Sequence, residues 1–321
     1  MYFSKNNSFS HGVMFHHFHD KYNFKKSQGS ISANQFKKII KFIGKKNIIS
    51  PNDFLDLVNK KKLKKKYCCI TFDDSLKCQF KIALPVLEEF KIKAFFFIFS
   101  NSFSNNPDLV EVYRFFRTNY FKNIEDFYIS YFDILYQLYS EEKITHFLKS
   151  KEKIFNVSKK LYPFYSSEDI NFRIIRSYFL DQNKYKKIML EMFKQKNFEY
   201  KKIFKKLFMS KNEIMKIHKL DHKIGLHTHS HKVNFKSLEY NAQLKEYKLN
   251  KKILENIIKV KIDSMSHPLG SYNKNTLKIL DSLNIKLGFR DNMRKSNFMK
   301  KTNNTNFEIA REDHVNILKR I

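Results

Sequence analysis

Two acidic residues and two histidines, far apart in the sequence, have the types and the spacing of a metal site. Asp73 and Asp74 are adjacent and directly follow an apolar run, and His227 and His231 lie in the stretch HKIGLHTHSHK at 222–232. The four-residue spacing predicts that both imidazoles lie on one side of a helical turn, a common arrangement for chelating zinc. One carboxylate would complete a three-ligand set with positions open for water and substrate.

The paired aspartates predict two different roles. Consecutive side chains of an extended segment point in opposite directions, so one carboxylate can bind a metal ion while its neighbour acts as a base on water. His229 lies between the two ligand histidines and is predicted to point away from them. Adjacent carboxylates are rarely buried without a partner, which disfavours a purely structural role. The chemistry that these residues predict is metal-assisted hydrolysis.

The elements that would position these residues alternate between strands and helices. The predicted strands cover 12–18, 67–72, 93–99, 222–227, 262–268, 286–289 and 307–310, and the predicted helices cover 32–44, 83–91, about 237–259 and 274–283. Buried, non-alternating strands are typical of parallel β/α units with helices outside the sheet. Such folds place their sites at the carboxyl ends of the strands, which is where Asp73, Asp74, His227 and His231 lie.

One long segment breaks this alternation. No glycine occurs between Gly44 and Gly225, and from about 107 to 218 the chain is rich in Phe, Tyr, Leu, Ile and Lys at helical spacing. We expect a helical insertion at about 104–206, with four to six helices. A plain structural subdomain and a lid over the substrate are both compatible with this pattern.

The formal charge of +31 raises nucleic acid or a membrane surface as partners. The excess of lysine is spread along the chain, and only NKKKLKKKY at 59–67 is a dense run. A solvated helix end or loop is the expected structure of that run, and contact with anionic lipid or a nucleotide-linked substrate is the functional alternative. No nucleic acid partner is expected.

The cysteines and apolar runs predict a cytoplasmic protein. Cys68, Cys69 and Cys78 are odd in number, and two of them are adjacent, so they are expected to be buried, reduced thiols. The N-terminal stretch has no apolar segment typical of a signal peptide. The longest aromatic and aliphatic run, AFFFIF at 94–99, is too short to span a bilayer.

Three motifs resemble those of the polysaccharide deacetylases, the NodB-homology or carbohydrate esterase 4 family. They are TFDD at 71–74, HTHSH at 227–231 and PLGSYN at 268–273. The resemblance covers about 12–103 and 207–311 and leaves out the helical segment. Together the motifs are specific, although neither the aspartate pair nor the histidine pair would be so alone.

The resemblance implies a fold and a set of roles. The fold would be a distorted (β/α) barrel of about seven parallel strands, forming one domain over 1–321 with the helical insertion. Asp73 would be the general base, and Asp74, His227 and His231 would bind a divalent metal ion, usually Zn²⁺. The turn residues Pro268, Leu269, Gly270 and Tyr272 would lie at the substrate, with the N–H of Leu269 stabilising the oxyanion.

The sequence departs from the family pattern at several positions. Ser75 stands where glycine is usual, and SHPLG lacks the arginine that steers the base. Arg290 or Arg311 could replace that arginine, and Arg311 is our candidate beside the substrate. The motif that supplies the general acid is not evident near the C-terminus. His16 is the preferred acid, His314 the alternative, which is more typical of a surface histidine.

These observations predict a metal-dependent hydrolase that removes an N-acetyl or other acyl group from an amino sugar. The substrate would be nucleotide-linked, lipid-linked or free, and destined for a surface polysaccharide. A deformylase or amidase of the same fold is a near alternative. An inactive deacetylase-like scaffold and a basic module that binds nucleic acid or anionic membranes are alternatives from other classes. The basic module would bind in a salt-sensitive way that does not need Asp73.

Overall fold

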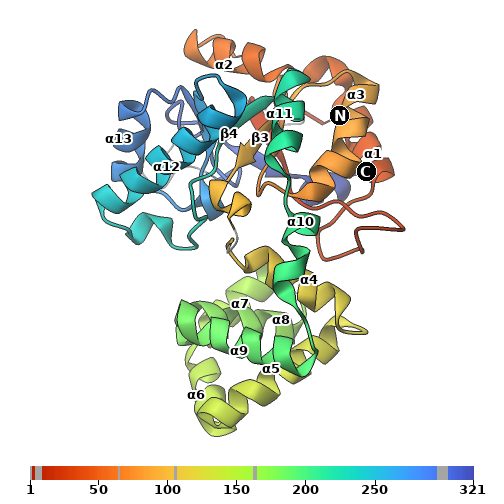
Figure 1. Ribbon diagram of the computed structural model, residues 1–321, viewed down its shortest axis with the longest axis vertical. Coiled ribbons are helices and arrows are strands. Elements are labelled where there is room, and N and C mark those ends of the chain that lie inside the picture. The colour runs from red at the N-terminus through yellow and green to blue at the C-terminus, as the bar shows by residue number, and fades with distance from the viewer. Residues whose placement is uncertain (1, 4–8, 64–65, 105–106, 162–164, 295–302) are drawn as a thin grey trace. The chain divides into compact units, whose positions relative to one another are not determined.

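The computed structural model describes residues 2–3, 9–63, 66–104, 107–161, 165–294 and 303–321 (Figure 1). The chain divides into two compact units: Met1–Asp108 with Phe204–Ile321, and Leu109–Ile203. The second unit lies within the predicted insertion. Residues 64–65 of the basic run at 59–67 lie outside the described part.

The first unit is built on a sheet of seven parallel strands. The strands are β1 (His11–Phe15), β2 (Cys68–Phe72), β3 (Ala94–Ile98), β4 (Lys223–Leu226), β5 (Ser264–Ser266), β6 (Leu287–Phe289) and β7 (Arg311–Asp313). Their order in the sheet is β6-β5-β4-β3-β2-β1-β7, and all neighbouring strands pair in parallel. The sheet curves into a nearly closed barrel, so the predicted barrel fold is confirmed.

The segment before β7 nearly closes the barrel. Ile309 forms an isolated parallel bridge with Phe289 of β6, and the N–H of Gly12 in β1 donates to the carbonyl of Ala310 at 3.0 Å. The predicted last strand at 307–310 is therefore wrong, because ladder pairing with β1 begins only at Arg311. Ile309 pairs with β6 at one edge of the sheet, whereas Arg311, two residues later, pairs with β1 near the other edge. Because the chain passes from one strand to the other so quickly, Ile309 forms a single bridge and not a ladder.

The two faces of the curved sheet bury different side chains. Phe95 and Phe97 of β3 contact Phe289 of β6, with ring centroids 5.3 and 5.5 Å apart, although two strands separate β3 from β6. Only the inner face of a curved sheet brings such distant strands together. The alternate residues, such as Phe96 and Ile98, belong to a larger cluster with the helices. The strands are therefore apolar on both faces, as the sequence predicts.

The described part of the first unit contains helices that the sequence predicts and others that it does not. They are α1 (Ala33–Ile43), α2 (Pro51–Asn59), α3 (Leu84–Phe90), α10 (Phe204–Leu207), α11 (Lys211–Lys219), α12 (Tyr240–Ile258), α13 (Lys274–Ser282) and α14 (His314–Leu318). Ser32 and Gln35 form a capping box at the start of α1, and Gly44, with φ of 85°, ends it. The bounds of α1, α3, α12 and α13 are close to the predicted ones, whereas α2 and α14 were not predicted. Phe54 and Val58 of α2 pack with the inner cluster.

The second unit is helical. Its described residues form α4 (Val110–Asn119), α5 (Ile124–Tyr139), α6 (Glu141–Ser150), α7 (Glu152–Leu161), α8 (Ser167–Ile174) and α9 (Gln182–Gln195). Aromatic rings fill its core: Tyr131 of α5 lies edge-on to Phe172 of α8 at 4.8 Å. Figure 1 shows these helices packed side by side, in yellow to green. Among the described residues of the whole chain, no helix is both long and apolar enough to cross a membrane.

Candidate active site

Asp73 and Asp74 follow the carboxyl end of β2, where the backbone makes a tight turn. Asp74 and Ser75 both have left-handed backbone conformations, with φ of 76° and 58°. This conformation explains why glycine is usual at position 75, since a side chain there is strained. The buried Ser75 hydroxyl instead accepts the N–H of Phe99 at 3.1 Å, which anchors the turn to the end of β3.

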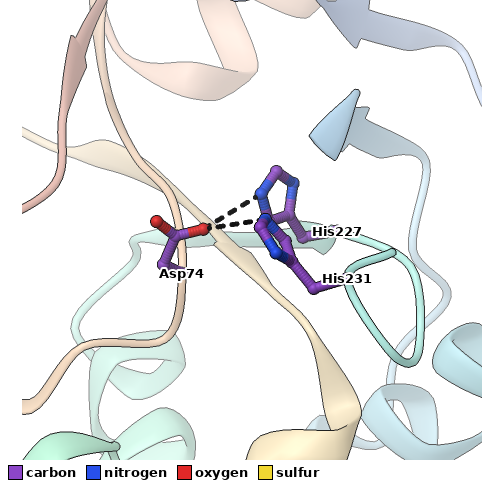
Figure 2. Close-up of side chains that lie close together, drawn as sticks. All are labelled: Asp74, His227 and His231. Carbon is purple, nitrogen blue, oxygen red and sulfur yellow. Dashed lines mark ion pairs between the residues drawn. The ribbon is translucent and has the colours of Figure 1, made fainter. Parts of the chain in front are cut away.

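Asp74, His227 and His231 converge on one point (Figure 2). Asp74 Oδ1 lies 3.3 Å from Nε2 of His227 and 3.2 Å from Nε2 of His231. One ligand atom from each of the three residues lies within 4.8 Å of the other two. Burial raises the pKa of Asp74, and hydrogen bonds from the two imidazoles lower it well below its usual value.

The two histidines do not lie on a helical turn, so this part of the prediction is wrong. They belong to a loop after β4 in which Thr228 and His231 have φ of 61° and 52°. The Thr228 hydroxyl accepts the N–H of His231 at 3.2 Å and stabilises this bend. His229 points elsewhere, as predicted, and its Nδ1 pairs with Ser100 Oγ at 2.9 Å.

The geometry of these residues fits a divalent metal ion. His227 Nδ1 donates to the carbonyl oxygen of Ser266 at 2.9 Å, which leaves the Nε2 lone pair directed at the convergence point. The N–H of His227 lies 3.0 Å from Asn250 Oδ1, a second contact that holds this residue. Two imidazole nitrogens and one carboxylate oxygen form a donor set that suits zinc and related first-row metals.

Asp73 is held by Arg311, which reaches it from β7. Arg311 Nη1 and Nη2 donate to Oδ1 and Oδ2 of Asp73, each at 2.7 Å, and both side chains are buried. Burial raises the pKa of Asp73, and the Arg311 guanidinium lowers it below its usual value. Asp73 is therefore a carboxylate at neutral pH, the form that a general base requires.

Of the two candidate arginines, Arg311 contacts Asp73 and Arg290 has other partners. Arg290 donates from Nε to the carbonyl of Glu308 at 3.0 Å, away from Asp73. Arg311 has no exposed surface, so it contacts Asp73 and not a substrate that approaches from solvent. Gly12 makes room for it, because a Cβ at Gly12 would lie 2.9 Å from Arg311 Cγ.

His16 lies between the two aspartates at the carboxyl end of β1. Its Nε2 is 3.9 Å from Asp73 Oδ2 and 3.8 Å from Asp74 Oδ2, and its side chain is 27% exposed. A partly exposed imidazole at this position can exchange a proton with both substrate and solvent.

His314, the alternative acid, is buried and is not the surface histidine that the sequence suggested. Its ring stacks on Phe15, and its nitrogens lie 3.2 Å from the carbonyl of Met14 and 2.9 Å from that of Gly29. These contacts hold the ring within the core, because α14 begins directly after β7 and packs against β1.

The turn Pro268–Gly270 follows β5 at the same end of the barrel. Leu269 has φ of 51°, and the residue is 55% exposed. A Cβ at Gly270 would lie 2.3 Å from an oxygen of Asp291, so this turn packs closely on the segment after β6. Tyr272 donates its hydroxyl to Glu308 at 2.8 Å and stacks on His267 at 4.2 Å.

Ser266 was not anticipated as a site residue. Its hydroxyl donates to Asp73 Oδ2 at 3.0 Å and accepts from Arg311 Nη2 at 2.9 Å. The only signal in the sequence is its position, two residues before Pro268, where the family motif has the arginine that steers the base. A small hydroxyl in that place leaves space for an arginine from another strand.

The comparisons with known proteins agree with this geometry. The family model described as polysaccharide deacetylase matches residues 60–114 and 179–288, which is just over half of the chain. The chain belongs to the polysaccharide deacetylase family, and it is a hydrolase of the class that acts on amide C–N bonds. A comparison with curated proteins found no significant match.

Several solved structures share the fold. A deacetylase from Streptococcus pyogenes, PplD, in complex with acetate is 14% identical, with 96% of each chain covered and a TM-score of 0.54. IcaB from Ammonifex degensii is 13% identical, with 97% of this chain and 96% of that chain covered and a TM-score of 0.56. The deacetylase domain of BpsB from Bordetella bronchiseptica is 11% identical, with 96% of each chain covered and a TM-score of 0.52. At these identities the likeness establishes the fold alone.

Proposed function

We propose that this protein is a metal-dependent deacetylase that removes an N-acetyl group from an amino sugar. The observation that carries the proposal is the separation of two adjacent carboxylates. Asp73 is paired with a buried guanidinium, and Asp74 faces two imidazoles. A carboxylate kept ionised beside a three-ligand metal site is the arrangement that hydrolysis of an amide needs.

Each residue has a defined part in the reaction. Asp73 takes a proton from the water molecule whose oxygen bonds to the acyl carbon. The N–H of Leu269 donates to the oxygen that becomes negatively charged in the tetrahedral intermediate. His16, when protonated, gives a proton to the sugar nitrogen as the C–N bond breaks, and the products are acetate and a free amine.

Asp74, His227 and His231 would hold the divalent ion, and Zn²⁺ is the proposed metal. Such an ion supplies Lewis-acid chemistry, because it polarises the acyl carbonyl and makes water more acidic. The bond from His227 Nδ1 to Ser266 orients the imidazole before any metal binds.

The substrate that we propose is a building block of a surface polysaccharide, nucleotide-linked, lipid-linked or free. Action in the cytoplasm is part of the proposal, and it is consistent with three buried cysteines that form no disulfide among the described residues. Recovery of the protein from an exported fraction of its native cells would contradict this location.

The test combines metal analysis with product analysis. Purified wild type, loaded with Zn²⁺ or Co²⁺, is expected to bind about one ion per chain and to release acetate and amine from N-acetylated amino sugars. Asp73→Asn is expected to keep the metal and to lower kcat by about 10²- to 10⁴-fold, the usual contribution of a general base. His227→Ala is expected to lose the metal.

The outcomes separate the alternatives. Formate released from formylated substrates, without acetate from acetylated ones, would indicate a deformylase of the same fold. Wild type that binds no metal and releases no acid would contradict the proposed hydrolysis and favour an inactive scaffold. Salt-sensitive binding to nucleic acid or anionic vesicles that survives Asp73→Asn, without hydrolysis, would favour the basic binding module.

A further inference from the structure

Ser266 contacts Asp73 through its hydroxyl and His227 through its backbone carbonyl. Its hydroxyl contacts the base and the arginine, with Asp73 Oδ2 at 3.0 Å and Arg311 Nη2 at 2.9 Å. Its backbone carbonyl accepts Nδ1–H of His227 at 2.9 Å. The residue is fully buried at the end of β5. One residue therefore joins the general base to a proposed metal ligand.

We propose that Ser266 is a positioning residue that sets the orientation of Asp73 relative to the metal ligands. The inference rests on the proposed deacetylase function and deepens it. Arg311 donates two hydrogen bonds to Asp73, one to each carboxylate oxygen. The Ser266 hydroxyl adds a third donor, from a strand that also holds His227 in place.

The physical reason is that the two residues approach Asp73 from opposite sides: Arg311 lies on β7, beyond β1, and Ser266 lies on β5, beyond β3 and β4. Serine has one side-chain torsion that matters here, and its backbone is held by β5, whose ladder partners are β4 and β6. The Ser266 hydroxyl contacts both the Asp73 carboxylate and the Arg311 guanidinium, so it fixes this ion pair relative to β5. Because the carbonyl of the same residue holds His227, a shift of β5 would move base and ligand together.

Ser264 provides a matched control on the same strand. It is two residues earlier in β5, is buried on the same face and, among the described residues, its hydroxyl has no hydrogen-bond partner. Ser264→Ala removes a buried hydroxyl from β5 without touching Asp73. It therefore controls for general effects of the substitution on the strand.

The first experiment measures steady-state kinetics and metal content of wild type, Ser266→Ala, Ser266→Thr and Ser264→Ala. Ser266→Ala removes the hydrogen bonds of the hydroxyl with Asp73 and with Arg311, and it is expected to lower kcat about tenfold. KM and bound metal should stay unchanged, because the carbonyl that holds His227 remains. Ser266→Thr should recover most of the loss, and Ser264→Ala should resemble wild type.

A kcat of Ser266→Ala within twofold of wild type would overturn the inference. So would an equal loss in Ser264→Ala, or a loss that appears only as reduced metal content. Wild type without any deacetylase activity would instead contradict the proposed function.

A second measurement tests the Ser266–Asp73 contact in the absence of substrate. Urea unfolding midpoints of the metal-free protein are compared for Ser266→Ala, Asp73→Asn and the double variant. If the hydroxyl holds Asp73, the two shifts should not add, since Ser266→Ala removes the contact and Asp73→Asn removes the charge that strengthens it. Shifts that add within error would overturn the inference, whatever the activity assays find.

Discussion

At the scale of residues, Asp73 and Asp74 have identical side chains but different hydrogen-bond and ion-pair partners. Both Asp73 and Asp74 have lowered pKa values despite burial, but through different partners. Asp73 is neutralised by a guanidinium that cannot lose its proton, whereas Asp74 faces imidazoles that can also bind a metal ion. The partner decides the role of each carboxylate, because the two carboxyl groups are chemically the same.

The pair of Arg311 and Asp73 yields a prediction about stability. Arg311→Met is expected to destabilise the metal-free protein by about 3–5 kcal/mol, because it leaves a buried carboxylate without its counter-charge. The double variant Arg311→Met, Asp73→Asn should recover part of that loss, since no buried charge remains. Urea unfolding at pH 7 measures both. A loss below about 1 kcal/mol in the single variant would show that Asp73 finds another partner.

At the scale of elements, the carboxyl ends of the strands carry the chemistry and their amino ends carry structural contacts. His222, just before β4, illustrates the second kind. Its Nδ1 accepts the N–H of Ala94 at 3.1 Å, and its Nε2 lies 3.2 Å from Glu88 Oε1. Burial lowers the pKa of His222 to about 4, with Lys93 acting in the same direction. Protonation of Nδ1 would break the bond to Ala94 at the start of β3.

This lowered pKa predicts a loss of stability in mild acid. Because the unfolded chain binds the proton near pH 6.5 and the folded chain near pH 4, stability falls as the pH drops between these values. The fall from this residue is about 3 kcal/mol. His222→Asn keeps an acceptor for Ala94 but cannot titrate, so it should flatten the pH dependence in that window.

Unfolding midpoints at pH 4, 5, 6 and 7 test this expectation. His146→Asn, which changes an exposed histidine of the helical unit, is the control and should keep the slope of wild type. Equal slopes in His222→Asn and wild type would contradict the assignment.

At the scale of the whole molecule, the charge of +31 is the dominant feature. Like charges repel each other more in the compact state than in the expanded one, so the excess of lysine destabilises the folded protein at low ionic strength. The exposed ion pairs, such as Lys60–Asp56, Lys184–Asp181 and Lys202–Glu199, contribute little against this repulsion.

Moderate salt is therefore expected to stabilise the protein. Raising NaCl from about 20 to 200 mM shortens the Debye length from about 20 Å to below 10 Å and should raise the thermal midpoint. KCl should act equally, because screening does not depend on the identity of the ion. A midpoint that stays constant or falls in both salts would show that the repulsion is already balanced in the fold.

The sequence alone determined the fold class and the residues that converge on the site. Short apolar strands alternating with helices require a parallel sheet, and polar residues after strands such as β2 and β4 must then meet at one edge. Local patterns carried this information, and Asp74, His227 and His231 do converge there. Only the tertiary structure decided which arginine neutralises Asp73, that His314 is buried and that Ser266 contacts both Asp73 and His227. These contacts join residues from 39 to about 300 positions apart and arise from the curvature of the sheet and its near closure by Ile309, which no local pattern encodes.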